Sequence, residues 1–265
     1  MYIALCLVVF LATYALNTVT ITVGYHRGLA HGAVRLSARS RRALIVMGNW
    51  VTGLDPKAWC VMHRMHHAHS DGTLDPHSPV NVGVLGVFAE QLKSYENTIR
   101  ALLKKDPAYT RYAVDLDFPL SWLNRRGVWF LPYLLHATVA VVLGVSVGWA
   151  LGAAWFLGMM SHPLQGGIVN GLGHAVGGRN FATDDNSRNN HLAAWLIGGE
   201  GFQNNHHHAP ASARFSYTPM EVDVGYGVCL LLDAVGVLEV QEHSLLPRQR
   251  HVLTAGDPVA NASHG

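Results

Sequence analysis

The sequence has little charge for its length. Only 14% of the 265 residues are Asp, Glu, Lys or Arg, whereas 49% are hydrophobic, and the mean hydropathy is +0.17. Soluble domains carry about 25% charged residues, so this composition argues against an acidic linker or a nucleic-acid-binding domain. The net charge of +2 is also too small to indicate a polyanionic partner.

Cysteine is scarce as well. Cys6, Cys60 and Cys229 lie far apart, with no paired spacing that would indicate a disulfide framework or a thiolate zinc site. A metal ion in this protein would therefore be held by imidazole. Histidine is abundant, with 17 residues, and packing alone does not account for that number.

Long stretches of the chain have no charged residue at all. None precedes Arg27, and none lies between residues 127 and 178. A helix rises about 1.5 Å per residue, so the second stretch is more than twice as long as a bilayer core of about 30 Å and must turn back. We predict membrane-spanning helices at about residues 3–24, 128–145 and 149–171. The first lacks a basic start and a cleavage site, which favours a retained span over a targeting peptide.

Two other apolar stretches are less suited to crossing a membrane. Residues 43–54 are too short, and we predict an interfacial or half-inserted helix with Trp50 and Trp59 at the level of the lipid headgroups. Residues 224–238 contain Asp233, which favours a helix that packs in the core or lies parallel to the membrane plane.

The arginines and lysines predict how the chain lies in the membrane. They gather after the first predicted span and before the second, so both of these regions should be cytoplasmic. The sequence thus predicts an all-α integral membrane protein with about three transmembrane helices, and with interfacial helices under a cytoplasmic, histidine-rich helical cap. We expect a single domain over residues 1–247 and a disordered tail over residues 248–265.

Many histidines fall in groups near the predicted cytoplasmic ends of the apolar stretches. The groups are His26 with His31, His63 with His66 and His67, His174 alone, and His206 with His207 and His208. His63, His66 and His67 have the spacing of one helix face. His26 and His31 are five residues apart and need an unwound or bulged turn to converge, which Gly28 permits.

The number of grouped histidines bears on the metal. Neutral imidazole binds iron, zinc and copper well, and one ion takes about four to six ligands, so eight or so imidazoles indicate two ions. The isolated histidines are explained more simply as core or surface residues: His136, His162, His191, His243, His251 and His264. His174 lies in an uncharged segment, where an ionisable group is a functional candidate, so packing and ligation are both open for it.

Together these motifs resemble the membrane fatty acyl desaturases, and specifically the acyl-CoA desaturase branch that includes stearoyl-CoA desaturase. The resemblance covers most of residues 23–238. HRGLAH is similar to the first histidine box of this family, and HRMHHAHSDGTLDPH is similar to the second box with its S-D and D-P-H elements. IVNGLGH is similar to the N-x3-H segment of the last transmembrane helix, and GEGFQNNHHHAP is similar to the third box.

The resemblance implies a di-iron centre that removes two hydrogens from an acyl chain, with dioxygen as co-substrate. Its ligands would be His26, His31, His63, His66, His67, His174, His206 and His207, and Asn170 would reach iron directly or through water. Asp71, Asp75 and Glu200 would hydrogen-bond to the ligand imidazoles. For Glu200, a helix cap or an interdomain ion pair is the alternative.

The third box departs from the family pattern H-x-x-H-H. Gln203 stands at its first position, and an additional histidine, His208, follows His207. Three arrangements are open: Gln203 binds through its amide oxygen, one iron has an open position, or the register shifts and His208 becomes a ligand. If the box keeps its register, His208 is not a ligand. Because of this departure, desaturation has an alternative. It is the hydroxylation of an acyl or alkyl chain, or the formation of another alkene or an acetylenic bond.

The resemblance also implies partners. The substrate would be an acyl-CoA or a lipid-linked acyl chain, in a channel for which Trp59 and Thr52 are candidate lining residues. An interfacial anchor is the alternative for Trp59. Lys57, Arg64 and Arg188 are candidates for a phosphate-bearing carrier and equally for solvated surface charges. Because the sequence has no His-Pro-Gly-Gly haem module, electrons would come from a separate donor of ferredoxin, rubredoxin or cytochrome b5 type, with its reductase.

The start of the chain differs from the family as well. Eukaryotic relatives have a transmembrane helix before the one that carries the first box, whereas this chain starts within the latter helix, which places its N-terminus outside the cytoplasm. Either the preceding hairpin is lost or the start is internal. A non-redox membrane zinc protein is a further class of function, and the absence of an HExxH motif argues against it.

Overall fold

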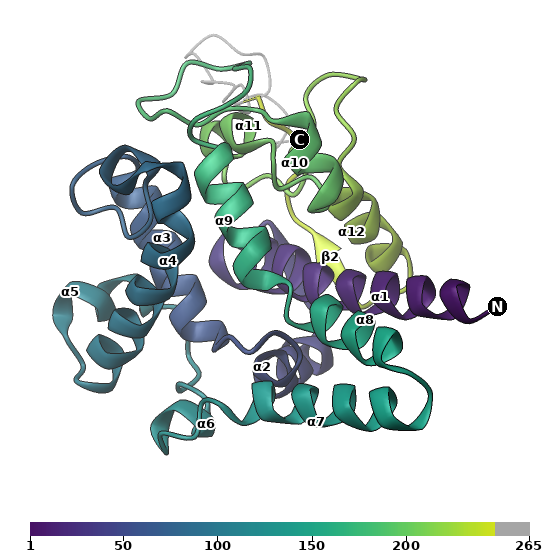
Figure 1. The fold of residues 1–265 in the computed structure, drawn as a ribbon. Coiled ribbons are helices and arrows are strands. Elements are labelled where there is room, and N and C mark those ends of the chain that lie inside the picture. The colour runs from purple at the N-terminus through teal and green to yellow at the C-terminus, as the bar shows by residue number, and fades with distance from the viewer. Residues whose placement is uncertain (247–265) are drawn as a thin grey trace, which may run out of the picture.

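The computed structural model describes residues 1–246, and nearly all of their regular structure is helical (Figure 1). The predicted, predominantly helical fold is confirmed. One small sheet pairs β1 (Val34–Leu36) antiparallel with β2 (Leu238–Val240). The helices are α1 (Tyr2–Val19), η1 (Thr20–Ala30, a π-helix), α2 (Ala38–Thr52), α3 (Pro56–His69), α4 (Pro79–Leu103), α5 (Pro107–Thr110), η2 (Arg111–Ala113, a 3₁₀-helix), α6 (Trp122–Arg125), α7 (Leu131–Ser146), α8 (Trp149–Met159), α9 (His162–Leu172), α10 (His191–Leu196), α11 (Gln203–His208) and α12 (Val224–Ala234). The predicted tail, residues 248–265, lies outside the described residues.

α1 and η1 together form one continuous helix, Tyr2–Ala30. Within residues 1–246 it is the one helix long and apolar enough to cross a membrane, and the first predicted span lies inside it. The other two spans stay predictions, because α7, with 16 residues, and α8, with 11, are apolar but shorter.

The predicted third span, residues 149–171, is divided into α8 and α9. Pro163, in the first turn of α9, has no N–H group with which to continue the hydrogen-bond ladder. Side chains satisfy the carbonyl groups that this break leaves open: Asn17 Nδ2 donates to the Met159 oxygen at 2.6 Å, and Ser161 Oγ donates to the Gly158 oxygen at 2.8 Å. A buried asparagine of α1 therefore stabilises an interruption that the apolar pattern of residues 149–171 does not predict.

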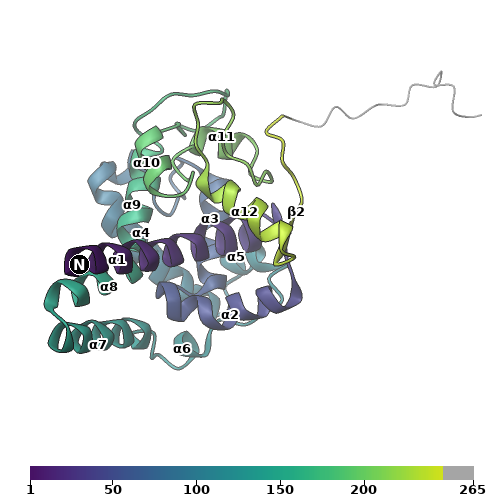
Figure 2. The ribbon, with the colours of Figure 1, turned by 90° about the vertical axis from the view of Figure 1, so that its right-hand side faces the viewer.

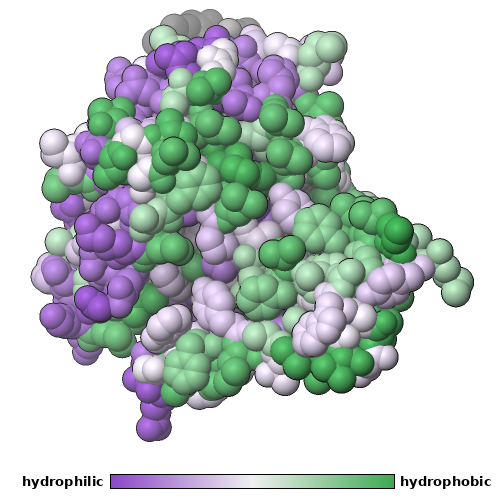
Figure 3. All heavy atoms as spheres, viewed as in Figure 1, coloured by the Kyte–Doolittle hydropathy of each residue, from purple (hydrophilic) through white to green (hydrophobic). Residues whose placement is uncertain are grey.

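α7 and α8 form a hairpin, and α8 lies against α1 (Figures 1 and 2). Glycine lets these backbones approach closely. A Cβ atom on Gly152 would lie 2.2 Å from the Ala140 carbonyl oxygen of α7, and one on Gly158 would lie 2.0 Å from Thr13 Oγ1 of α1. In Figure 3, apolar side chains gather over this part of the molecule, whereas polar side chains gather over the opposite end, around α11.

Two shorter predicted segments also correspond to helices. Residues 43–54 lie largely in α2, which begins where Ser37 Oγ accepts the Ser40 N–H and ends at Gly53, whose φ of +74° favours glycine. Residues 224–238 contain α12, which ends at Ala234 before Gly236 and the strand β2.

The turn between the first two histidines is a π-helix. In η1 the His31 N–H donates to the His26 carbonyl oxygen at 3.1 Å, a bond between residues five apart. This bulged geometry brings the two imidazoles together, with their ring centroids 5.0 Å apart. The structure therefore contains the bulge that the spacing of His26 and His31 requires.

Candidate metal centre

Five imidazoles from four parts of the chain converge on one point. They come from η1 (His26), its C-terminal end (His31), α3 (His63 and His67) and α11 (His206). Contacts of 2.7 to 3.1 Å join their Nε2 atoms in the order His26, His206, His67, His63, His31. An ion with nitrogen ligands at about 2.1 Å holds neighbouring ligands about 3.0 Å apart when they subtend a right angle. The spacing of this five-imidazole group thus fits a bound metal ion.

A second group contains three imidazoles, those of His66, His174 and His207. Their Nε2 atoms are buried and have no hydrogen-bond partner, and one ring nitrogen of each histidine lies within 4.8 Å of those of the other two. The two groups adjoin, since the rings of His67 and His207 stack at a centroid distance of 4.4 Å. This three-imidazole group could hold a second ion.

Carboxylates fix the orientation of these rings. The Nδ1 atom of His66 lies 2.9 Å from Asp75, that of His174 lies 3.0 Å from Asp71, and that of His207 lies 2.5 Å from Asp185. In the five-imidazole group, His26 Nδ1 lies 2.6 Å from Glu200. A carboxylate that accepts the Nδ1 proton leaves the lone pair on Nε2, which is the state that binds a metal ion. The predicted partners Asp71, Asp75 and Glu200 thus all lie on ring nitrogens of the two groups.

The electrostatics keep several of these imidazoles neutral. Burial lowers the pKa of His63, His67 and His206 well below its ordinary value, and neighbouring imidazoles lower it further. The pKa of His207 falls to about 4, because burial outweighs the opposing hydrogen bond to Asp185. Burial raises the pKa of Asp71, but hydrogen bonds, the first of them from His174, outweigh it and bring that pKa to about 2. Neutral rings and ionised carboxylates are the protonation states that metal binding requires.

Glu200 is itself held by a buried cation. Its Oε1 lies 2.8 Å from Arg27 Nη1, and Arg27 Nη2 lies 3.0 Å from Asp223 on the other side. The guanidinium also lies over the Phe215 ring, 3.7 Å from its centroid. Arg27 has no exposed surface. This ion-pair chain connects the first histidine motif to the loop before α12.

Sequence reasoning missed several residues of the site. Asp185 belongs to a polar loop in which nothing distinguishes it from its neighbour Asp184, and Asp223 precedes an apolar helix by one position. His77 is buried, and its ring stacks on that of His66 at 4.6 Å. With His66 and Asp75 it forms a third group that could hold a metal ion. The D-P-H element that contains His77 was the available signal.

His208 lies outside the histidine and carboxylate groups that could hold a metal ion in the described part of the chain. Gln203 is buried, and its amide Nε2 donates to the Glu200 carbonyl oxygen at 2.7 Å. The ring of His208 stacks on Phe181 at a centroid distance of 3.9 Å. Asn170 lines a cavity beside the five-imidazole group, as Gln203 does.

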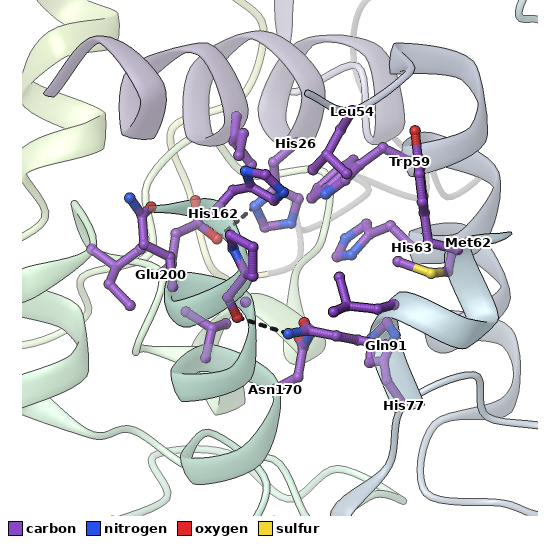
Figure 4. A pocket seen from close by; sticks show the side chains of 18 of the residues that line it. His26, Leu54, Trp59, Met62, His63, His77, Gln91, His162, Asn170 and Glu200 are labelled. Carbon is purple, nitrogen blue, oxygen red and sulfur yellow. Dashed lines mark hydrogen bonds and ion pairs between the residues drawn. The ribbon is translucent and has the colours of Figure 1, made fainter. Parts of the chain in front are cut away.

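This cavity lies between η1, α3, α4 and α9 (Figure 4). His26, His63 and Glu200 reach its wall, and Trp59 lies parallel to His63 with the ring centroids 5.0 Å apart. Six further lining residues are large and apolar: Ile21, Leu54, Met62, Leu92, Val169 and Ile197. His77, Gln91, His162 and Gln165 also line the cavity and are polar. Thr52 is not among the lining residues, and its hydroxyl donates to the Gly48 carbonyl oxygen at 2.9 Å.

The isolated histidines, expected as core or surface residues, lie outside the imidazole groups in the described part of the chain. His136 Nε2 bonds to the Trp50 carbonyl oxygen, His162 lines the cavity, His191 packs beside Phe202, and His243 Nδ1 bonds to the Tyr226 hydroxyl. His251 and His264 lie outside the described residues. Of the possible phosphate-binding cations, Lys57 donates to two carbonyl oxygens, Arg64 pairs with Asp115, and Arg188 donates to Gly177.

Comparison with known proteins identifies the family. The fatty acid desaturase family model matches residues 2–221. A hex-5-enoyl-[acyl-carrier protein] acetylenase of Moorena producens is 30% identical over 236 residues, 85% of this chain and 73% of the relative. An sn-2 palmitoyl-lipid 9-desaturase of Nostoc sp. is 30% identical over 244 residues, which are 88% and 80% of the two chains. An acyl-CoA 5-desaturase of Anemone leveillei is 30% identical over 227 residues, which are 82% and 65%. The chain therefore belongs to the fatty acid desaturase family and is an oxidoreductase.

Proposed function

We propose that this protein is an oxygen-dependent membrane enzyme that introduces a double bond into a fatty acyl chain at a di-iron centre. One iron would bind the five-imidazole group, and the other would bind His66, His174 and His207. The observation that carries the proposal is the pairing of four ring nitrogens with Asp71, Asp75, Asp185 and Glu200. Each pairing leaves an Nε2 lone pair on the side where the imidazoles meet.

The donor set supports iron as the metal. Nitrogen donors suit iron, zinc and copper, and the nearby carboxylates are engaged by ring nitrogens instead of being free to bind a hard cation. Membership of the desaturase family favours iron among these. Bound iron would supply the redox chemistry with dioxygen that the removal of hydrogen from an unactivated chain requires.

The residues of the chain would position the substrate. An acyl chain in the cavity would pass His26 and His63, whose rings reach the cavity wall, and would contact Trp59. The apolar lining excludes water and fixes which carbon lies next to the centre. Glu200 and Arg27 would hold the His26 ring in place while the chain is bound.

The substrate and the electron donor follow from different observations. The names of the three relatives contain an acyl carrier protein, a lipid and coenzyme A, so a fatty acyl chain is what their substrates share. We favour acyl-CoA or a lipid-linked acyl chain for this protein. An open groove lined by His67, His207 and polar residues such as Asp184 adjoins both imidazole groups. A separate electron donor of ferredoxin, rubredoxin or cytochrome b5 type could approach the centre there.

We place the protein in the membrane with the imidazole groups at its cytoplasmic end. Tyr2–Ala30 is long enough to span, and large apolar side chains of α7 such as Leu134, Val141 and Val145 are exposed. A lipid environment would cover these side chains. The basic residues near the histidine motifs predict the cytoplasmic orientation.

Formation of an acetylenic bond, or hydroxylation, is the second candidate. The acetylenase relative is the specific observation in its favour, because a centre that removes hydrogens from a chain can do so at a carbon that is already unsaturated. The acyl cavity and the imidazole groups serve both reactions equally. The product distinguishes them.

The test is expression of the full chain in a host with extractable lipids, followed by mass spectrometry with localisation of double bonds. We expect a new monounsaturated acid, which is lost in His66→Ala and kept in His243→Ala, a change at an exposed histidine outside the groups. A hydroxylated or acetylenic product would support the second candidate. An unchanged lipid profile, with zinc and no iron in the purified protein, would contradict both.

A further inference from the structure

The two imidazole groups differ in number and in spacing. Five Nε2 atoms form a chain of contacts no longer than 3.1 Å, whereas His66, His174 and His207 make no Nε2 contact of hydrogen-bond length. The smaller group therefore supplies fewer nitrogens over a wider space. An ion there would have three imidazole ligands, and water or an added anion would complete its coordination.

Gln203 stands where the family pattern has the first histidine of the third box. Its amide nitrogen is fixed by the Glu200 carbonyl oxygen, and the side chain faces the acyl cavity. An amide oxygen is also a weaker ligand for iron than a neutral imidazole. Gln203 lies four residues before His207 on α11, and a Cβ atom on Gly173, the residue before His174, would lie 2.5 Å from its Cγ. Gln203 thus stands where a histidine would bring a fourth nitrogen to the three-imidazole group.

Asn170 lines the cavity and would offer an amide oxygen instead of an imidazole nitrogen. Two further histidines lie near this fourth position and are placed differently. His208 stacks on Phe181 and lines the outer groove, so the register of the box is not shifted. His77 belongs to the separate group with His66 and Asp75, apart from His174 and His207. Among the described residues, no fourth imidazole joins the smaller group.

We propose that the two sites bind metal with unequal affinity: the five-imidazole site fills first, and the three-imidazole site holds an exchangeable ion. Gln203 is the residue that sets this difference. The inference rests on the proposed di-iron function and extends it to the order in which the centre assembles. A histidine at position 203 would reduce the difference, because its ring would add a nitrogen beside His207.

The experiment measures metal binding by the full chain purified in detergent and stripped of metal. Fe²⁺ is added without oxygen in competition with a chelator, and bound iron per chain is measured by mass spectrometry. We expect two phases of one ion each, with affinities that differ at least about tenfold. A tenfold loss of metal affinity is the smallest that is typical when a residue hydrogen-bonded to a metal ligand is removed. Cobalt absorption provides a second readout, with the two ions giving distinct spectra in sequence.

Variants assign the two phases to the two sites. His174→Ala should remove the weak phase and keep the tight one, and His31→Ala should weaken the tight phase. Gln203→His should bring the phases closer than tenfold, whereas His208→Ala, the matched control, should bind as the unchanged chain does. Two ions that bind in one phase, or loss of the weak phase in His208→Ala, would overturn the inference.

The outcome is separable from that of the proposed function. A chain that desaturates lipids but binds two ions in a single phase would overturn only the unequal sites. A chain that binds no iron would overturn the proposed function itself.

Discussion

The histidine-rich end of the molecule and its apolar end are stabilised in different ways. Around the imidazole groups, charged and polar side chains meet at fixed distances, as in the pairs His66–Asp75 and Arg27–Glu200. Around α1, α7 and α8, backbones approach through glycine, and few side-chain hydrogen bonds cross between helices. Directional contacts fix the position of a ring nitrogen, whereas close packing sets only how near two helices lie.

The largest effect is expected where the buried ion pairs of the histidine-rich end are broken. Arg27→Met removes the cation between Glu200 and Asp223, and both carboxylates stay buried without it. We expect a loss of about 3–5 kcal/mol in the free energy of unfolding, the usual cost of breaking a buried pair. The measurement is denaturant-induced unfolding in detergent.

The matched control is Arg41→Met, which breaks the exposed pair with Asp117. An exposed pair contributes about 1 kcal/mol or less. Equal losses in the two variants would show that the buried chain of charges does not stabilise the histidine-rich end.

A change of pH should affect the same end through its histidines. Burial, followed by the nearby His66, lowers the pKa of His77 to about 3, and burial lowers that of His207 to about 4. Because the unfolded chain takes up protons first as the pH falls through about 6.5, the stability that the neutral rings confer is lost towards acid pH. For these two groups, the metal-free protein should lose about 3 kcal/mol between pH 7.5 and 5.5.

The measurement is the free energy of unfolding of the metal-free protein at both pH values. His207→Ala should reduce this pH dependence, and His243→Ala should leave it unchanged because that ring is exposed. A stability that rises towards pH 5.5 would contradict the assignment of neutral, buried rings.

A smaller effect is expected from the carboxylate that sequence reasoning missed. Asp185→Asn weakens the hold on His207 Nδ1 and should lower the metal affinity of the three-imidazole group about 10–100-fold. The neighbouring, exposed Asp184 provides the control, and Asp184→Asn should retain the affinity of the unchanged chain. Iron content measured against a chelator distinguishes the two. An unchanged affinity in Asp185→Asn would mean that His207 does not depend on this pairing.

How far the sequence predicts the structure also differs between the two ends. The histidine groups were found because their members are close in the chain, and His63, His66 and His67 follow a helical spacing that the structure retains in α3. Asp185 was missed because it reaches His207 from a loop 22 residues earlier, and only the fold brings them together. Arg27 lies within the first motif, but its role depends on Glu200 and Asp223, which are distant in sequence.

At the apolar end, composition predicted helices but not their interruptions. The pattern of residues 149–171 is uniformly uncharged, so hydropathy cannot place the break between α8 and α9. Pro163 was a local signal, since proline is suited to the first turn of a helix. The partner that stabilises the break, Asn17, is remote in sequence and lies on a helix that reads as an ordinary apolar span.

The smallest effect is expected from that asparagine, and it tests whether the apolar end depends on packing more than on hydrogen bonds. Asn17→Leu keeps the number and branching of the side-chain heavy atoms but removes the donor to the Met159 carbonyl oxygen. We expect a loss of about 1 kcal/mol, the net value of one hydrogen bond, measured by unfolding in detergent. Thr20→Ala is the control, because the Thr20 hydroxyl is bonded only within its own helix, to Leu16. A loss as large as that of Arg27→Met would mean that the apolar end also depends on directional polar contacts.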